Sequence, residues 1–145
     1  MRLTQFTDYA YRALIYLAMR PDELCTVQEI SDCYKLSKNH LMKVIQKLGQ
    51  TGFVETIRGK GGGLRLAHPA SEINIGAVAR AMEGPLCVVE CMGDNSACKI
   101  ESGCILKSAL TRAANAFFNI LDEYSLEDIT KRKSELGRLL FTDAA

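Results

Sequence analysis

Three cysteines lie close together in the segment CMGDNSACKIESGC, which runs from Cys91 to Cys104. The segment is polar and has too few apolar residues for a strand or a core helix. Thiolates are soft ligands, so Cys91, Cys98 and Cys104 could bind one metal centre, either an iron-sulfur cluster or zinc. The spacing C-x6-C-x5-C is neither the paired C-x2-C of most zinc modules nor the tight run of ferredoxins. Three unligated thiols, or a disulfide with one thiol left over, are the alternative.

The composition limits what surrounds this segment. A chain of 145 residues can form one compact domain, or a small domain with an extra helical arm. The sequence contains neither the ~20 consecutive apolar residues of a membrane span nor the features of a signal peptide. We therefore expect a soluble, cytoplasmic protein without a membrane partner. In such a reducing compartment, six cysteines are more often metal ligands or redox groups than structural disulfides.

The charge of the chain is unevenly distributed. The net charge is only +1. The segment from Ser37 to Leu66, however, contains a single acid, Glu55, and six basic residues, which are Lys38, Lys43, Lys47, Arg58, Lys60 and Arg65. A local basic patch on a near-neutral protein is typical of a nucleic-acid contact. A solvated lysine-rich helix face is the alternative reading of the charge alone.

The first half of the chain has the pattern of a helix-turn-helix unit. Apolar residues recur with helical spacing over residues 4–19, and Pro21 ends that helix. Thr26 begins a capping box for a short helix to about Tyr34, and Ser37 caps a second helix over residues 38–50. Two short helices joined by a tight turn, the second of them basic, are typical of proteins that place the second helix in the major groove of DNA.

A basic hairpin is predicted directly after this unit. Residues 53–58 and 64–66 read as two strands, and Gly59-Lys60-Gly61-Gly62-Gly63 forms the tip between them. Glycines at such a tip tolerate positive φ and a close approach to a backbone. The hairpin therefore has the character of a wing, from which Arg58 could enter the minor groove. A nucleotide-binding loop is disfavoured because GKGGG lacks both the required spacing and a following helix.

The second half is expected to position the cysteines and to form a dimer. A helix over residues 75–83 ends at Gly84-Pro85, the cysteine segment follows, and a long helix runs from residue 105 to about Tyr124. The apolar face of this long helix is wider than a small domain can cover, so we expect it to pair with a second copy. A short helix over residues 126–131 and a tail of uncertain order complete the chain. The predicted fold is mainly α with a small β-hairpin wing: a winged helix-turn-helix domain (1–84), a cluster-binding loop (85–104) and a dimerisation helix with a tail (105–145).

These parts together resemble the family of winged-helix regulators that includes NsrR and IscR. The resemblance covers nearly the whole chain, and its most specific part is the block SKNHLMKVIQKLGQTGFVETIRGKGGGLRLAHPA. It implies a homodimer that binds a partly palindromic site on double-stranded DNA. By motif, the DNA-binding residues would be Thr26, Gln28, Ser37, Lys38, Asn39, His40, Lys43, Arg58, Lys60, Gly61 and Gly62.

The resemblance also implies that Cys91, Cys98 and Cys104 ligate an iron-sulfur cluster, which we expect to be 4Fe-4S, with 2Fe-2S as the alternative. The IscR pattern has a His three residues after the third cysteine, where this chain has Lys107, which cannot ligate while protonated. Resemblance to the NsrR group instead implies Asp8 of the partner subunit as the fourth ligand, with Cys87 as the competing candidate. Cys25 and Cys33 are better explained as small buried apolar residues.

The function implied is a transcriptional repressor that senses nitric oxide and loses DNA affinity when its cluster is nitrosylated. A regulator of the same family that senses iron or cluster supply, or redox state through the cysteines, is the alternative. An enzyme is not expected. The two histidines, His40 and His68, lie in the proposed DNA helix and after the wing, and the sequence has no C-x-x-C redox pair.

Overall fold

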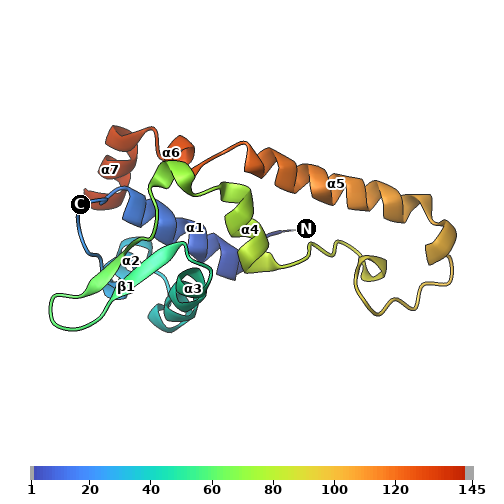
Figure 1. Cartoon of the computed structure of the whole chain (residues 1–145), viewed down its shortest axis with the longest axis horizontal. Helices are drawn as coiled ribbons and strands as arrows, with labels where there is room; N and C mark the ends of the chain where they lie inside the picture. The colour runs from blue at the N-terminus through green and yellow to red at the C-terminus, as the bar shows by residue number, and fades with distance from the viewer. Residues whose placement is uncertain (1, 143–145) are drawn as a thin grey trace.

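The computed structural model describes residues 2–142. It confirms the predicted fold class, because the chain is mainly helical and its two strands form one antiparallel hairpin (Figure 1). The elements follow in the order α1 (Gln5–Ala18), α2 (Val27–Tyr34), α3 (Lys38–Gln50), β1 (Val54–Ile57), β2 (Gly63–Leu66), η1 (Ala70–Glu72), α4 (Ile75–Glu83), η2 (Glu90–Met92), η3 (Glu101–Gly103), α5 (Ile105–Asp122), α6 (Leu126–Ile129) and α7 (Lys133–Phe141). Within the described residues, no helix is both long and apolar enough to cross a bilayer.

The helices begin where hydroxyl side chains cap them. Thr26 and Glu29 form the predicted capping box of α2, and the Ser37 hydroxyl accepts a hydrogen bond from the backbone N–H of His40 at the start of α3. Between these two helices, Lys35 adopts a left-handed conformation with φ 55°, which closes the tight turn. The helix-turn-helix unit is therefore encoded locally, by caps and one turn.

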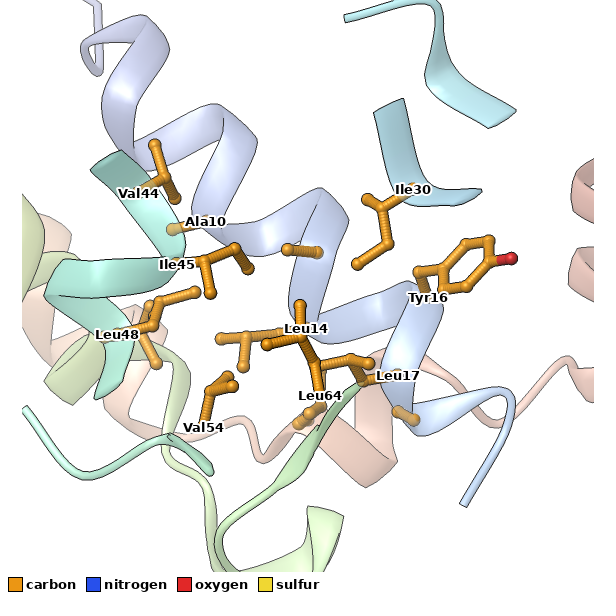
Figure 2. Close-up of a cluster of buried hydrophobic side chains, with 14 of the residues drawn as sticks. Ala10, Leu14, Tyr16, Leu17, Ile30, Val44, Ile45, Leu48, Val54 and Leu64 are labelled. Carbon is orange, nitrogen blue, oxygen red and sulfur yellow. The ribbon is translucent and has the colours of Figure 1, made fainter. Parts of the chain in front are cut away.

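The hydrophobic core lies under α1. Leu14 and Leu17 of α1 are buried against Ile30 of α2 and Leu48 of α3, and Leu64 closes the core from the hairpin (Figure 2). Burial of this apolar face is the main force that holds α1 to the helix-turn-helix unit and the hairpin. Because α1 is central to the core, a shift of α1 would change its packing against α2, α3, α4 and β2.

The hairpin is short and its tip depends on glycine. β1 pairs with β2 so that Val54 lies opposite Leu66. β1 is shorter than predicted because Phe53 and Arg58 fall outside the ladder, whereas β2 is one residue longer because Gly63 pairs with Ile57. Gly59 and Gly61 have φ of 99° and 77°, as expected for residues that must tolerate left-handed backbone. The hairpin is also paired on its other side, because Cys25 exchanges backbone hydrogen bonds of 3.0 and 2.7 Å with Leu64.

The C-terminal end of α5 is fastened to α4 by polar contacts. The Arg80 guanidinium donates two hydrogen bonds to the Asp122 carboxylate, of 2.6 and 2.7 Å, and stacks over the Phe118 ring at 4.8 Å. The Asn74 amide donates to the backbone carbonyl of Asp122 at 2.7 Å. Gly76 leaves the space that the Asp122 carboxylate occupies. The cysteine segment runs outward from α4, away from the other helices, and α5 lies above it in the view and leads back to this junction (Figure 1).

The tail of uncertain order is a helix over most of its described length. α7 lies against the outer side of α1, where the Phe141 ring meets the Tyr16 ring at 5.4 Å and the Arg20 guanidinium lies 4.4 Å from the Phe141 centroid. The Cys33 thiol donates to the Leu140 carbonyl at 3.2 Å. Sequence reasoning missed α7 because it has no side-chain cap and is stabilised by these tertiary contacts. Residues 143–145 of the predicted tail lie outside the described residues.

Candidate metal centre and nucleic-acid interface

The three cysteines lie on the connection between α4 and α5. Gly84, with φ 71°, ends α4, and the connection then forms two short 3-10 turns before α5 begins. Cys91 lies in the first of these turns, Cys98 lies between them, and Cys104 immediately precedes α5. All three thiols are unpaired, and Cys98 is exposed.

The connection is held by two acidic side chains. The Glu90 carboxylate accepts a hydrogen bond of 3.0 Å from the backbone N–H of Ala97, and the Lys107 ammonium pairs with Glu101. The hydrogen bond that the Lys107 ammonium donates to the Glu101 carboxylate raises the pKa of Lys107, and negative charge on Cys91 and Cys104 acts in the same direction. Cys91 and Cys104 therefore lie near one cation, which would offset the negative charge of thiolates there.

The donor set fits an iron-sulfur cluster by its chemistry. Cys91, Cys98 and Cys104 offer three soft sulfur ligands on one connection, where Cys98 is exposed and the other two are partly exposed. Among residues 2–142, however, no three potential ligands are close enough together to hold one metal ion. The cysteines thus share a segment without forming a closed site, and binding would require the connection to fold around the metal.

Asp8, the predicted fourth ligand, lies in the first turn of α1. Its carboxylate pairs with the Arg12 guanidinium through contacts of 2.8 and 3.1 Å, and both side chains remain partly exposed. Sequence reasoning missed Arg12, although the four-residue spacing to Asp8 on a helix was a usable signal. Within one chain, α1 lies well away from the outer end of α5, where Cys104 is found (Figure 1). Cys87, the competing candidate, is exposed and donates a weak hydrogen bond to the Met92 carbonyl at 3.5 Å.

A second carboxylate, which sequence reasoning did not identify, meets the same turn of α1. Glu83 accepts hydrogen bonds from the backbone N–H of Thr4 at 2.7 Å, from the Thr4 hydroxyl at 2.9 Å and from the Thr7 hydroxyl. Partial burial opposes ionisation of Glu83, but these hydrogen bonds outweigh it and hold the pKa of the carboxyl below its usual value. Glu83 and the threonines are more than 70 residues apart, so no local pattern could have revealed the contact.

The predicted DNA-binding residues of α3 differ in how much of each side chain is exposed to solvent. Lys38, Asn39 and Lys43 are exposed. His40 is only partly exposed, because its ring packs against Tyr9 at 4.9 Å and Phe6 at 6.1 Å. Part of the His40 ring therefore serves the contact between α1 and α3.

The other predicted DNA-binding residues flank α3. Thr26 and Ser37 are both N-caps, and the Gln28 amide donates to Asp32 at 2.7 Å. On the hairpin, Arg58, Lys60 and Gly61 are exposed and Gly62 is half-buried. An added Cβ at Gly62 would lie 2.2 Å from the Ile57 carbonyl oxygen, so a larger residue would distort the tip. Figure 1 shows the hairpin and α3 along one side of the molecule, with α5 and α7 along the other.

Comparison with known proteins gives a consistent result. A model of the Rrf2 family, described as an iron-dependent transcriptional regulator, matches residues 3–132. The HTH-type transcriptional regulator NsrR of Bacillus subtilis is 49% identical over 142 residues, which cover 97% of each chain. The solved structure of T. potens IscR matches 94% of this chain and 90% of its own, with a TM-score of 0.74 and 25% identity. CymR, the global cysteine regulator of B. subtilis, covers 91% of this chain and 98% of its own with a TM-score of 0.72 and 23% identity, which supports the fold.

Proposed function

The chain belongs to the Rrf2 family of transcriptional regulators, which are not enzymes, and from this premise we propose that it is a dimeric repressor that senses nitric oxide. Cys91, Cys98 and Cys104 would hold an iron-sulfur cluster, with 4Fe-4S preferred to 2Fe-2S. The observation that carries the proposal is the set of three unpaired thiols on one exposed connection, in a chain similar to proteins named NsrR. When bound, such a cluster supplies iron atoms that nitric oxide can coordinate.

Asp8 of the partner subunit is our choice for the fourth ligand. A carboxylate oxygen matches iron less well than a thiolate does, so it would be displaced more readily. In each protomer the Arg12 guanidinium orients the Asp8 carboxylate. A carboxylate has about four lone-pair sites, which leaves capacity for a metal beside the ion pair. Cys87 remains the competing ligand.

A second copy of the chain would cover α5. Ile105, Leu106 and Ile120 are 85%, 63% and 58% exposed, which is unusual for large aliphatic side chains on one helix. Pairing of α5 with its copy would bury them and bring each cysteine connection near the other subunit. The two α3 helices of such a dimer would reach successive major grooves of a partly palindromic operator, about 34 Å apart.

DNA binding is attributed to α3 and the hairpin, with the N-terminal residues of α3 reading base edges and phosphates. Lys38→Ala and Arg58→Ala are each expected to weaken operator binding and to lower the slope of log affinity against log salt by about 1, since each removes one positive charge from the DNA interface. Lys133→Ala at the start of α7 is the control, because Lys133 is exposed on the opposite side of α1. A salt slope unchanged in Arg58→Ala would remove the hairpin from the interface.

The sensing proposal is tested with protein purified without oxygen. We expect coloured protein that contains iron and sulfide, and operator affinity that falls when nitric oxide is added. Colourless protein with stoichiometric zinc would contradict the cluster. If iron removal abolished binding and nitric oxide did not, the iron-supply alternative would replace nitric oxide sensing; this alternative is favoured by the family description as iron-dependent. Loss of binding only with a thiol oxidant would favour a cysteine redox switch.

A further inference from the structure

The carboxylate of Glu83 joins the end of α4 to the first turn of α1. One oxygen, Oε1, accepts all three hydrogen bonds that Thr4 and Thr7 donate. Thr7 is completely buried, so its hydroxyl depends on a protein partner. The carboxylate also lies at the N-terminus of α1, where the helix dipole favours negative charge.

Glu83 accepts more hydrogen bonds than are needed to cap α1. Thr4 already caps α1 through the backbone N–H of Thr7 at 3.4 Å, so α1 would have a cap without Glu83. What Glu83 adds is a fixed position of that turn relative to α4. Asp8 belongs to the same turn, because it follows Thr7 directly and its backbone N–H donates to the Thr4 carbonyl at 3.1 Å.

Glu83 also marks where the cysteine connection departs. It is the last residue of α4, Gly84 follows, and the connection that carries Cys91 begins there. The Glu83 carboxylate therefore links the first turn of α1, which contains Asp8, to the point where the cysteine connection begins.

We infer that Glu83 is a positioning residue for the Asp8 carboxylate, which it acts on through Thr4 and Thr7. The inference rests on the proposed role of Asp8 as a ligand. Residues that orient a metal ligand from behind commonly change metal affinity by about 10–100-fold when they are replaced. Glu83→Ala removes the acceptor and leaves the buried Thr7 hydroxyl without it. Glu83→Gln keeps the size and one acceptor oxygen but loses the charge that strengthens the hydrogen bonds.

The test compares both variants with Asp8→Ala and with a matched control. Asp128 is the control, because its carboxylate accepts hydrogen bonds of 2.9 and 2.8 Å from the backbone and hydroxyl of Ser125 at the start of α6, far from Asp8 along the chain. The readouts are the visible absorption and circular dichroism of iron-loaded protein, the rate of iron loss to a chelator, and amide hydrogen exchange at Thr7 and Asp8 with and without iron.

We expect Glu83→Ala to shift the spectrum toward that of Asp8→Ala and to speed iron loss about tenfold, with Glu83→Gln intermediate. Exchange at Thr7 and Asp8 should accelerate in both variants with or without iron. Asp128→Ala should leave spectrum and iron loss unchanged even if it lowers the melting temperature. Because Glu83 is argued to act through Asp8, the Asp8→Ala/Glu83→Ala double variant should match Asp8→Ala alone.

Two results would overturn the inference while leaving the proposed function intact. One is a wild-type spectrum in both Glu83 variants of a protein whose spectrum does respond to Asp8→Ala. The other is a Glu83→Ala effect that adds fully to Asp8→Ala, which would make Glu83 a ligand in its own right. Wild-type protein that holds no iron would instead overturn the proposed function, and the inference with it.

Discussion

Replacing Cys91, Cys98 or Cys104 by Ser is expected to leave the protein without its iron and to reduce operator affinity almost to the level of binding to unrelated DNA. A neutral serine hydroxyl is a much poorer iron ligand than a thiolate, and three thiolates leave no sulfur to spare. Specific DNA binding usually exceeds non-specific binding by at least about a thousandfold, so a loss of that order is expected at constant salt. Iron and sulfide per protomer, together with operator binding measured without oxygen, check both parts.

Two serine variants outside the ligand set serve as controls. Cys87→Ser removes an exposed thiol from the same connection. Cys33→Ser removes a thiol of α2 that donates a hydrogen bond to the Leu140 carbonyl of α7. Both should retain iron and bind the operator. If Cys87→Ser lost iron as completely as Cys91→Ser, Cys87 would replace Asp8 as the fourth ligand. Full iron content in Cys98→Ser would contradict the proposed ligand set.

Gly76→Ala is expected to destabilise the protein by about 1–3 kcal/mol, although alanine is the better helix former. A Cβ at position 76 would lie 2.0 Å from Oδ1 of Asp122, a distance that no side-chain contact tolerates. The Asp122 carboxylate would have to move, and its two hydrogen bonds from Arg80 would be lost or distorted. Urea unfolding followed by far-ultraviolet circular dichroism measures the change in the free energy of unfolding.

Gly49→Ala provides the same substitution without the clash. Gly49 also lies inside a helix, and its added Cβ would meet only the Val54 carbonyl oxygen at an ordinary 3.8 Å. This variant should be neutral or more stable by up to about 1 kcal/mol. In an Asp122→Ala background the cost of Gly76→Ala should become smaller because the obstructing carboxylate is gone, but part of it should remain because the backbone nitrogen of residue 122 would still lie 3.0 Å from the new Cβ. Equal costs in the two backgrounds would show that the junction of α4 and α5 does not depend on this fit.

Most of the fold could be predicted because its signals are local. Thr26 with Glu29, and Ser125 with Asp128, form capping boxes that can be recognised within four residues, and both are present. The glycines of the hairpin tip identify the turn in the same way. α7 was missed because its stability comes from contacts with Tyr16 and Arg20, which are more than 100 residues away in the sequence.

The candidate metal ligands could be predicted from the sequence, but the side chains that hold the neighbouring helices in place could not. Cysteine spacing gave the metal hypothesis, and helical spacing could have given the pairing of Asp8 with Arg12. The contact of Glu83 with Thr7 and that of Arg80 with Asp122 join residues 76 and 42 positions apart. Such long-range pairs follow from how α4 packs on α1 and α5, which a single sequence does not encode in any local pattern.

Because its C-terminal end is fastened to α4 through Asp122, α5 can act as a lever arm. The helix has 18 residues, which span roughly 27 Å at about 1.5 Å per residue. A tilt of only about 10° at the Asp122 fulcrum therefore swings the Cys104 end through about 5 Å, close to the pitch of one helical turn. Conversely, a small force applied at the Cys104 end exerts a large torque on α4. A rearrangement of a few ångströms at the Cys104 end of α5 is therefore enough to rotate α5 against α4.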